Sequence, residues 1–259
     1  MKILDKVRLI FSFYLTNDNL YDEINQLHLS LISKYIHRFD EVVFCLIVND
    51  DIKTEVIQEF QKIVINMARK DVVFKIYENT NYRESYVLYN EIASQLDKLD
   101  GLTFFAHNKG ISDGFGRENV KTWIAALYFY SFEVNLPLDN MSGPMVYGPL
   151  KSRGCNHKYC SAAQNIHNWT YCGTFFWIKA QQISDYMERN SIKLPRLTNR
   201  WYSEMFLGNI MPQSEAWSHD DIFMEGIDIE GYKINEILEN VYGENWSYTY
   251  FKEYCLEIL

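Results

Sequence analysis

Apolar residues form short continuous runs in the first half of the chain, and each run is bounded by polar residues. Runs of this length that are rich in β-branched and aromatic side chains are typical of strands buried on both faces. The predicted strands are residues 7–15, 41–48, 72–77 and 102–106.

Longer segments between these runs carry apolar residues every three or four positions, as amphipathic helices do. The first begins after Asn17, Asp18 and Asn19, which offer N-caps, and two more are predicted at about 53–68 and 83–96. Alternating strands and helices with continuous apolar strands predict a parallel sheet that helices cover on both faces.

The pattern changes after residue 115, but no linker rich in glycine, serine or proline separates the two halves. We therefore expect a single domain, residues 1–259, in which the second half extends the same sheet. Its predicted elements are a helix at 117–133, a strand at 144–149, a polar loop at 151–168, an aromatic strand at 169–179, and helices at 181–191 and 200–210.

Composition excludes some functions. The net charge of −9 argues against a nucleic-acid surface, which needs clustered lysine and arginine. No apolar stretch approaches the roughly 18 residues of a membrane span, and the N-terminus lacks the apolar core of a signal peptide, so we expect a cytoplasmic protein. The five cysteines fit reduced thiols.

The strand at 102–106 ends at a polar tetrad, His107-Asn108-Lys109-Gly110. In open α/β sheets, ligands bind in the crevice beyond the carboxyl ends of the strands. We therefore expect His107 to Lys109 to face a bound substrate.

Three further motifs follow the tetrad: Trp123-Ile124, the segment Gly173 to Trp177 (Gly-Thr-Phe-Phe-Trp), and the segment Arg200 to Glu204 (Arg-Trp-Tyr-Ser-Glu). Their order and spacing resemble the nucleotide-sugar glycosyltransferases of the GT-A fold. They are most similar to bacterial polysaccharide and lipopolysaccharide transferases with His-(Ser/Thr)-Lys-Gly, Trp-Arg, Gly-Asn-Phe-Trp-Trp and Arg-x-x-x-Glu motifs. The resemblance spans residues 7–210.

The resemblance implies an α/β protein, a single Rossmann-like GT-A domain whose central sheet is mostly parallel and flanked by helices. Residues 1–114 would be the nucleotide-binding half, and residues 115–259 the acceptor-binding half. The implied reaction moves a sugar from a nucleotide-diphosphate donor to a bacterial surface polysaccharide or a lipid-linked glycan.

The resemblance places Asn49, Asp50 and Asp51 at the nucleobase, where side-chain oxygens accept from base N–H groups. In the alternative, Asp50 and Asp51 cap the following helix. Asn108 is also a candidate donor-binding residue.

Arg83 stands where related proteins show Asn-x-Gly-Arg-Asp, although Tyr82 and Glu84 depart from that pattern. A guanidinium there binds a phosphate or ribose-side oxygen. The alternative is an exposed helix start paired with Glu84.

The tetrad occupies the position of the metal-binding Asp-x-Asp of many GT-A enzymes but contains no carboxylate. Mg²⁺ and Mn²⁺ prefer oxygen ligands, so we expect Lys109, with protonated His107, to neutralise the leaving diphosphate in place of a metal. The alternative is a histidine satisfied by a backbone carbonyl and a lysine in solvent.

A Mg²⁺ or Mn²⁺ cofactor stays an alternative, because the chain has candidate metal ligands elsewhere. Asp113 is a metal candidate or a turn residue. His219 and Asp221 are weaker metal candidates, and the alternative use of their segment is to cap a helix from Ile222 onward.

Glu204 is the candidate general base that deprotonates the acceptor hydroxyl. The alternative is a helix-surface glutamate paired with Arg200. Arg200, Trp177 and Trp201 are candidates for the sugar and acceptor pocket.

Two segments outside these motifs add expectations about metals and partners. The residues Cys155, His157 and Cys160 match no common zinc spacing, so a loop over the active site is favoured over a zinc site. For the aromatic stretch 245–259 we favour packing or a homodimer contact over peripheral association with the inner face of the membrane.

Two other function classes stay open. Loss of the Asp-x-Asp motif also fits a nucleotide- or carbohydrate-binding protein without turnover. A nucleotidyltransferase would need a glycine-rich, basic loop after the first strand, where this chain has Thr16-Asn17-Asp18-Asn19.

Overall fold

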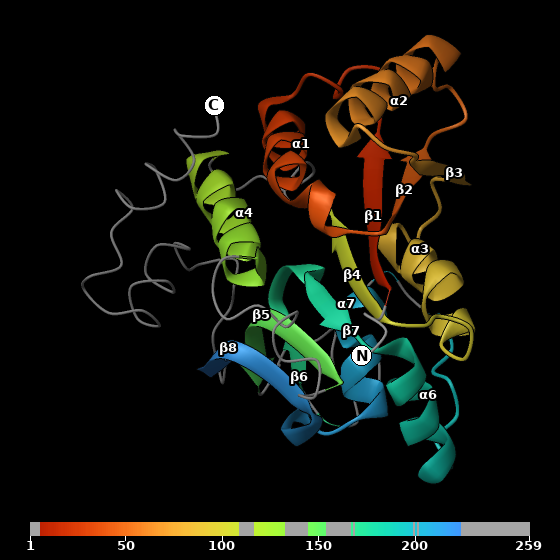
Figure 1. Cartoon of the computed structure of the whole chain (residues 1–259), viewed down its shortest axis with the longest axis vertical. Coiled ribbons are helices and arrows are strands. Elements are labelled where there is room, and N and C mark those ends of the chain that lie inside the picture. Colours follow the sequence, from red (N-terminus) through yellow and green to blue (C-terminus); the bar gives the residue numbers. More distant parts are fainter. Residues whose placement is uncertain are drawn as a thin grey trace, which may run out of the picture.

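The structure is a computed structural model with helices on both faces of a mixed, eight-stranded sheet (Figure 1). The α/β fold class expected from the sequence is therefore confirmed. Among the residues described, no helix has both the length and the apolar character to cross a bilayer. The described residues are 6–108, 117–132, 145–153, 167, 169–198, 200 and 202–223.

Four parallel strands form the first half of the sheet, in the order β3-β2-β1-β4. The chain runs outward from β1 through β2 to β3 and then returns to place β4 on the other side of β1. The direction of the strand order therefore reverses between β1 and β4, and such a switch point opens a crevice at the carboxyl ends of the two strands. The strands are β1 (Val7–Leu15), β2 (Glu41–Val48), β3 (Val73–Glu78) and β4 (Leu102–His107).

Six α-helices of the described part cover the sheet, and alternate residues of the strands decide which helices they meet. Leu9, Phe11 and Phe13 of β1 pack with α1, α2 and α4, whereas Ile10 packs with α3, α6 and α7. This two-sided burial explains the continuous apolar runs in the sequence. The helices are α1 (Glu23–Tyr35), α2 (Thr54–Ala68), α3 (Glu84–Glu91), α4 (Arg117–Phe132), α6 (Ala180–Arg189) and α7 (Tyr202–Ile210), with short 3₁₀ turns η1 (Ile36–Arg38) and η2 (Ala93–Gln95).

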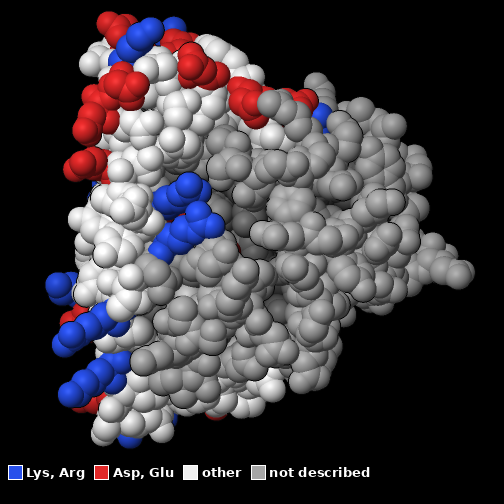
Figure 2. Space-filling view, turned by 180° about the vertical axis from the view of Figure 1, so that it is seen from behind, with Lys and Arg blue, Asp and Glu red and all other residues white. Residues whose placement is uncertain are grey.

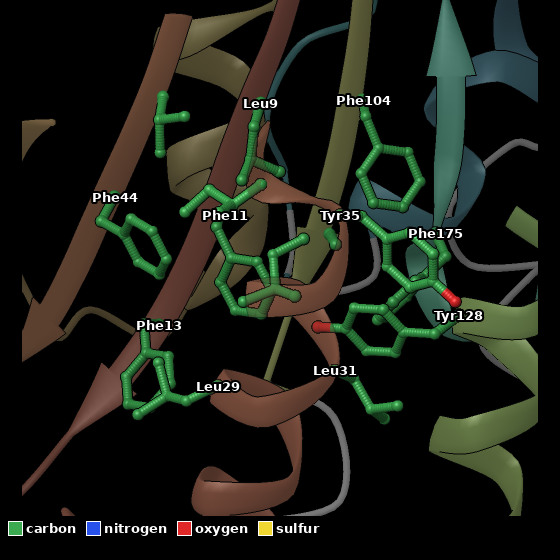
Figure 3. Close-up of a cluster of buried hydrophobic side chains, with 14 of the residues drawn as sticks. Leu9, Phe11, Phe13, Leu29, Leu31, Tyr35, Phe44, Phe104, Tyr128 and Phe175 are labelled. Carbon is green, nitrogen blue, oxygen red and sulfur yellow. The ribbon is translucent and has the colours of Figure 1, made fainter. Parts of the chain in front are cut away.

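Aromatic side chains fill the core between the sheet and the α1/α4 layer (Figure 3). The rings of Phe11 and Phe44 stack with centroids 5.4 Å apart, and Tyr128 meets Phe175 edge to face at 5.2 Å. Rings of this size bury large apolar areas and restrict one another's geometry. They fix the spacing between β1, β4 and the helix layer on this face.

The second half extends the same sheet, as the sequence predicts. Strand β7 (Phe176–Ile178) pairs with β4 in the antiparallel direction. Next to it, β5 (Val146–Arg153) pairs with β6 (Trp169–Tyr171) and β7 in antiparallel fashion and with β8 (Ala216–Phe223) in parallel.

The single aromatic strand expected at 169–179 is interrupted. Because β8 follows one edge of β5 along its length, β6 and β7 share the other edge. Between the two paired stretches, residues 172–176 of this segment face only residues 148–150 of β5. The 3₁₀ turn η4 (Cys172–Thr174) accommodates the extra residues. Gly173 adopts a φ of +76° there, which favours glycine.

Two sequence expectations about helix starts are wrong. Helix α1 is capped by Asp22, whose carboxylate accepts from the Ile24 N–H at 2.9 Å, and not by residues 17–19. The helix expected from Ile222 is also absent from the described part of the chain. Residues 218–221 follow η5 (Gln213–Glu215) and lie within β8.

Replacing Gly101 by alanine is expected to destabilise the protein. Gly101 has a φ of +71°, and a Cβ atom there would lie 2.0 Å from the Lys6 carbonyl oxygen. Gly101→Ala should lower the free energy of unfolding by about 1–3 kcal/mol, as urea denaturation measures. The exposed neighbour Lys98 provides the control, since Lys98→Ala should leave stability almost unchanged. Equal stability of both variants would contradict the expectation.

Candidate functional site

The side chain of Asn108 joins β1 and β4 at the switch point. The last backbone bond of this pairing runs from the Asn108 N–H to the Ser12 carbonyl at 3.2 Å. Beyond it, the Asn108 Oδ1 accepts from the Tyr14 N–H at 2.8 Å, and its Nδ2 donates to the Tyr14 carbonyl at 3.0 Å. The amide therefore continues the pairing of the two strands by one more residue.

Two more asparagines complete a closed ring around Tyr14. Asn108 Nδ2 also donates to the Oδ1 of Asn25, a fully buried residue of α1, at 2.8 Å. Asn25 donates to the Asn19 carbonyl at 2.8 Å, and Asn19 Nδ2 donates to the Tyr14 carbonyl at 3.1 Å. Sequence reasoning gave Asn108 a donor-binding role, but both of its N–H groups bond within the protein. These bonds hold the ends of β1 and β4 together.

Asn17 fixes the loop that follows β2. Its Oδ1 accepts from the Lys53 N–H at 2.8 Å, and its Nδ2 donates to the Asp51 carbonyl at 3.1 Å. Lys53 is the N-cap of α2 and no side chain caps that helix, so the capping alternative for Asp50 and Asp51 is wrong. Asp50 and Asp51 are exposed at the carboxyl edge of the sheet.

The neighbouring residue Asn49 links β2 to β3. Its Oδ1 accepts from Asn79 Nδ2 at 2.7 Å, and the Asn79 N–H donates to the Val48 carbonyl at 2.7 Å. Asn49 is thus half-buried at the base of the loop, and its side-chain oxygen already has one donor. The expected contact of Asn49 with a nucleobase stays a prediction.

His107 ends β4 at the switch point and is half-buried. Its Nε2 is 3.1 Å from the Gly173 carbonyl oxygen, so the ring donates from this nitrogen to η4. This contact is the one that the alternative interpretation of His107 expects. Lys109 and Asp113 lie outside the described residues, and their roles stay predictions.

Two buried serines join the starts of α3 and α7. The Ser85 Oγ lies 2.6 Å from the Arg200 carbonyl oxygen and 3.0 Å from the Ser203 Oγ, and it accepts from the Ser203 N–H at 2.9 Å. Ser85 is fully buried and Ser203 nearly so. Arg83 and Arg200, both exposed, stand beside this junction.

Glu204 lies in the first turn of α7 and is half-buried. The hydroxyl of Thr170 in β6 donates to the Glu204 carbonyl, and the indole of Trp169 donates to the Met211 carbonyl at 2.7 Å. Burial raises the pKa of the neighbouring Tyr202 phenol, which therefore stays neutral. Contacts with β6 and α3 thus hold α7, and Glu204 with it, on the same face of the sheet as Ser85.

The pocket role expected for Trp177 is wrong, because this residue belongs to the core. Its side chain is 1% exposed, and its indole N–H donates to the Ser131 carbonyl at 3.1 Å. Its ring lies 4.8 Å from Phe104 and 5.7 Å from Phe39, measured between centroids.

Several candidates for ligand or metal contacts are not described. Trp201, the loop with Cys155, His157 and Cys160, the side chains of His219 and Asp221, and the stretch 245–259 lie outside the described residues or side chains. Within the described part, no three histidine, cysteine, aspartate or glutamate residues are grouped so as to hold a metal ion.

Comparisons with known proteins do not assign the chain to a family. No family model and no curated protein matches it. Among solved structures, it is similar to a 4-diphosphocytidyl-2C-methyl-D-erythritol synthase from Anaerococcus prevotii, at 11% identity over 88% of this chain and 94% of that one, with a TM-score of 0.39. A nucleoside-diphosphate-sugar pyrophosphorylase from Vibrio cholerae matches at 10% identity over 83% and 92%, with a TM-score of 0.44. At these identities and TM-scores, the similarity does not indicate the activity of this chain.

Removing the Asn108 amide is expected to destabilise the switch point. Asn108→Ala removes the partner of the half-buried Tyr14 N–H and that of the buried Asn25 Oδ1, whereas the Tyr14 carbonyl keeps its bond from Asn19. Each unsatisfied buried group costs about 1–3 kcal/mol, so urea denaturation should show a loss of at least about 2 kcal/mol.

Asn190→Ala is the matched control. The Asn190 amide makes one exposed bond, to the Tyr186 carbonyl at 2.8 Å, so its loss should change stability by less than about 0.5 kcal/mol. A wild-type unfolding midpoint for Asn108→Ala would contradict the bridging role.

Proposed function

We propose that this protein is a glycosyltransferase that moves a sugar from a nucleotide-diphosphate donor to a bacterial surface polysaccharide or a lipid-linked glycan. The observation that carries the proposal is the meeting of separate chain segments near the carboxyl edge of the parallel sheet. The exposed loop with Asp50 and Asp51 follows β2, and His107 ends β4 at the switch point. Helix α7, which carries Glu204, is joined to α3 through Ser85.

Each segment has a role in the proposed reaction. Asp50 and Asp51 accept from the nucleobase, and Arg83, His107 and Lys109 face the diphosphate. The acceptor hydroxyl attacks the anomeric carbon of the sugar as the bond from that carbon to the diphosphate oxygen breaks. In an inverting transfer, Glu204 takes the hydroxyl proton and the nucleoside diphosphate leaves with the bonding electron pair.

His107 and Asn108, the described residues at the end of β4, do not suit a hard divalent metal. A Mg²⁺ or Mn²⁺ ion there would need several oxygen ligands in place of the missing Asp-x-Asp. The Asn108 Oδ1 already accepts from the Tyr14 N–H, and the nearer nitrogen of His107 faces the Gly173 carbonyl. We therefore assign neutralisation of the leaving group to cationic side chains, and no step passes through a metal.

The first test pairs nucleotide-sugar binding with turnover. Wild-type protein should be stabilised in a thermal-shift screen by one class of nucleotide sugar and should slowly hydrolyse it or transfer its sugar. Glu204→Gln should keep the thermal shift and lower turnover by about 10²-fold or more, because it removes the base but little donor contact.

Glu188→Gln is the control, since Glu188 is exposed on α6 and belongs to none of the motifs. It should leave both readouts unchanged. Full turnover by Glu204→Gln would exclude the base role. Binding without turnover in the wild type, with acceptor glycans present, would favour a non-catalytic binding protein.

Chelation gives a separate prediction. With EDTA in excess, turnover should stay within about twofold of its value in added Mn²⁺, because fixed cations supply the stabilising charge. The measurement is the rate of nucleoside-diphosphate release with and without chelator. A strict requirement for Mn²⁺ or Mg²⁺ would show that the metal-independent mechanism is wrong.

A further inference from the structure

Two arginines from distant parts of the sequence come to one corner of the molecule. Arg83 is the N-cap of α3, and Arg200 precedes α7 by two residues. The Arg200 carbonyl oxygen lies 2.6 Å from the Ser85 hydroxyl, which is two residues beyond Arg83. The Ser85 N–H donates to the Tyr82 carbonyl at 3.0 Å, so a tight turn holds Arg83 close to this contact.

The corner is fixed on several sides. Ser85 accepts from the Ser203 N–H at 2.9 Å and thereby sets the start of α7 against α3. The ring of Tyr89 in α3 meets that of Tyr202 edge to face, with centroids 5.8 Å apart. The Tyr202 hydroxyl in turn donates to the Pro195 carbonyl at 3.0 Å, which fixes the segment leading to Arg200.

The corner also lies on the ligand side of the sheet. Arg83 belongs to the loop between β3 and α3, which leaves the carboxyl edge, and Asn79 in this loop is bonded to Asn49 at the end of β2. Arg200 is therefore brought to the same edge as Asp50 and Asp51, although the sequence places it in the other half of the chain.

The two arginines add positive charge at this corner of an acidic protein. The chain has a net charge of −9, and Figure 2 shows acidic side chains concentrated along the upper edge of the view, with basic side chains near the middle, along the lower left edge and at the top. A multiply charged anion at this corner would be attracted to both guanidinium groups. Glu84 and Glu204 stand in the first turns of the two helices, where a carboxylate is stabilised by backbone N–H groups as well as by arginines.

We infer that Arg83 and Arg200 together form one diphosphate-binding site, with one guanidinium for each phosphoryl group. A guanidinium binds phosphate oxygens through two parallel N–H bonds, so two arginines suit the two phosphoryl groups of a diphosphate. This moves Arg200 from the acceptor pocket, where the sequence placed it, to the donor side. That the diphosphate belongs to a nucleotide sugar rests on the proposed function.

Calorimetric titration with inorganic pyrophosphate tests the shared site directly. Wild-type protein should bind one pyrophosphate per chain. Arg83→Gln and Arg200→Gln should each weaken binding about tenfold, since each removes charge-assisted hydrogen bonds to the same ion. Arg196→Gln is the matched control: Arg196 is exposed on the segment before α7, and its loss changes the net charge equally. It should bind as the wild type does.

The outcomes separate the shared site from the proposed function. Arg200→Gln that binds pyrophosphate like Arg196→Gln would overturn the inference, as would two pyrophosphates per chain or none. If Arg200→Gln loses pyrophosphate affinity but the wild type turns over no nucleotide sugar with acceptor glycans present, the anion site stands and the glycosyltransferase proposal fails. If turnover is found and is unaffected by Arg200→Gln, the glycosyltransferase proposal stands and the shared site fails.

Discussion

The bridge from Asn108 to Tyr14 is the interaction on which the arrangement at the switch point depends. Strands β1 and β4 are hydrogen-bonded neighbours, and a backbone bond from the Asn108 N–H to the Ser12 carbonyl lies at the carboxyl end of their pairing. The amide of Asn108 offers an acceptor and two donors in one plane and satisfies both polar groups of Tyr14 together with Asn25. Both backbone polar groups of Tyr14 are therefore bonded at the end of the pairing, as buried backbone groups require.

The choice of asparagine also sets the charge at this end of the sheet. A carboxylate at position 108 would accept from the Tyr14 N–H but would face the Tyr14 carbonyl and the Asn25 Oδ1 with no hydrogen to donate. The ring formed by Asn19, Asn25 and Asn108 holds the loops without adding negative charge. Such a neutral strand end is compatible with an anionic ligand, because the cations that bind it need not compete with structural carboxylates.

Much of the fold was predictable because its strands are buried on both faces and read as continuous apolar runs. The interruption at η4 was not predictable. Strands β6 and β7 form one continuous aromatic stretch in the sequence, and only the extra residues between their pairings with β5 separate them. The role of Asn17 was hidden for a similar reason: its side chain bonds to the loop 34–36 positions away and not to the next helix. Trp177 has an aromatic side chain that would suit a sugar pocket, but both faces of β7 are buried and the side chain packs in the core.

The meeting of Arg83 with Arg200 depends on the Ser85–Ser203 contact, between residues 118 positions apart, and no local pattern reports it. This contact has a consequence for the chemistry. Arg200 and Glu204 border or belong to the first turn of α7, so a shift of that helix moves both the proposed phosphate ligand and the proposed base. Because Ser85 holds the start of α7 while Trp169 bonds to the Met211 carbonyl just past its end, the spacing of cation and base is set by helix docking. Reactive groups held by packed helices keep the alignment that an in-line displacement requires, since small misplacements are costly in rate.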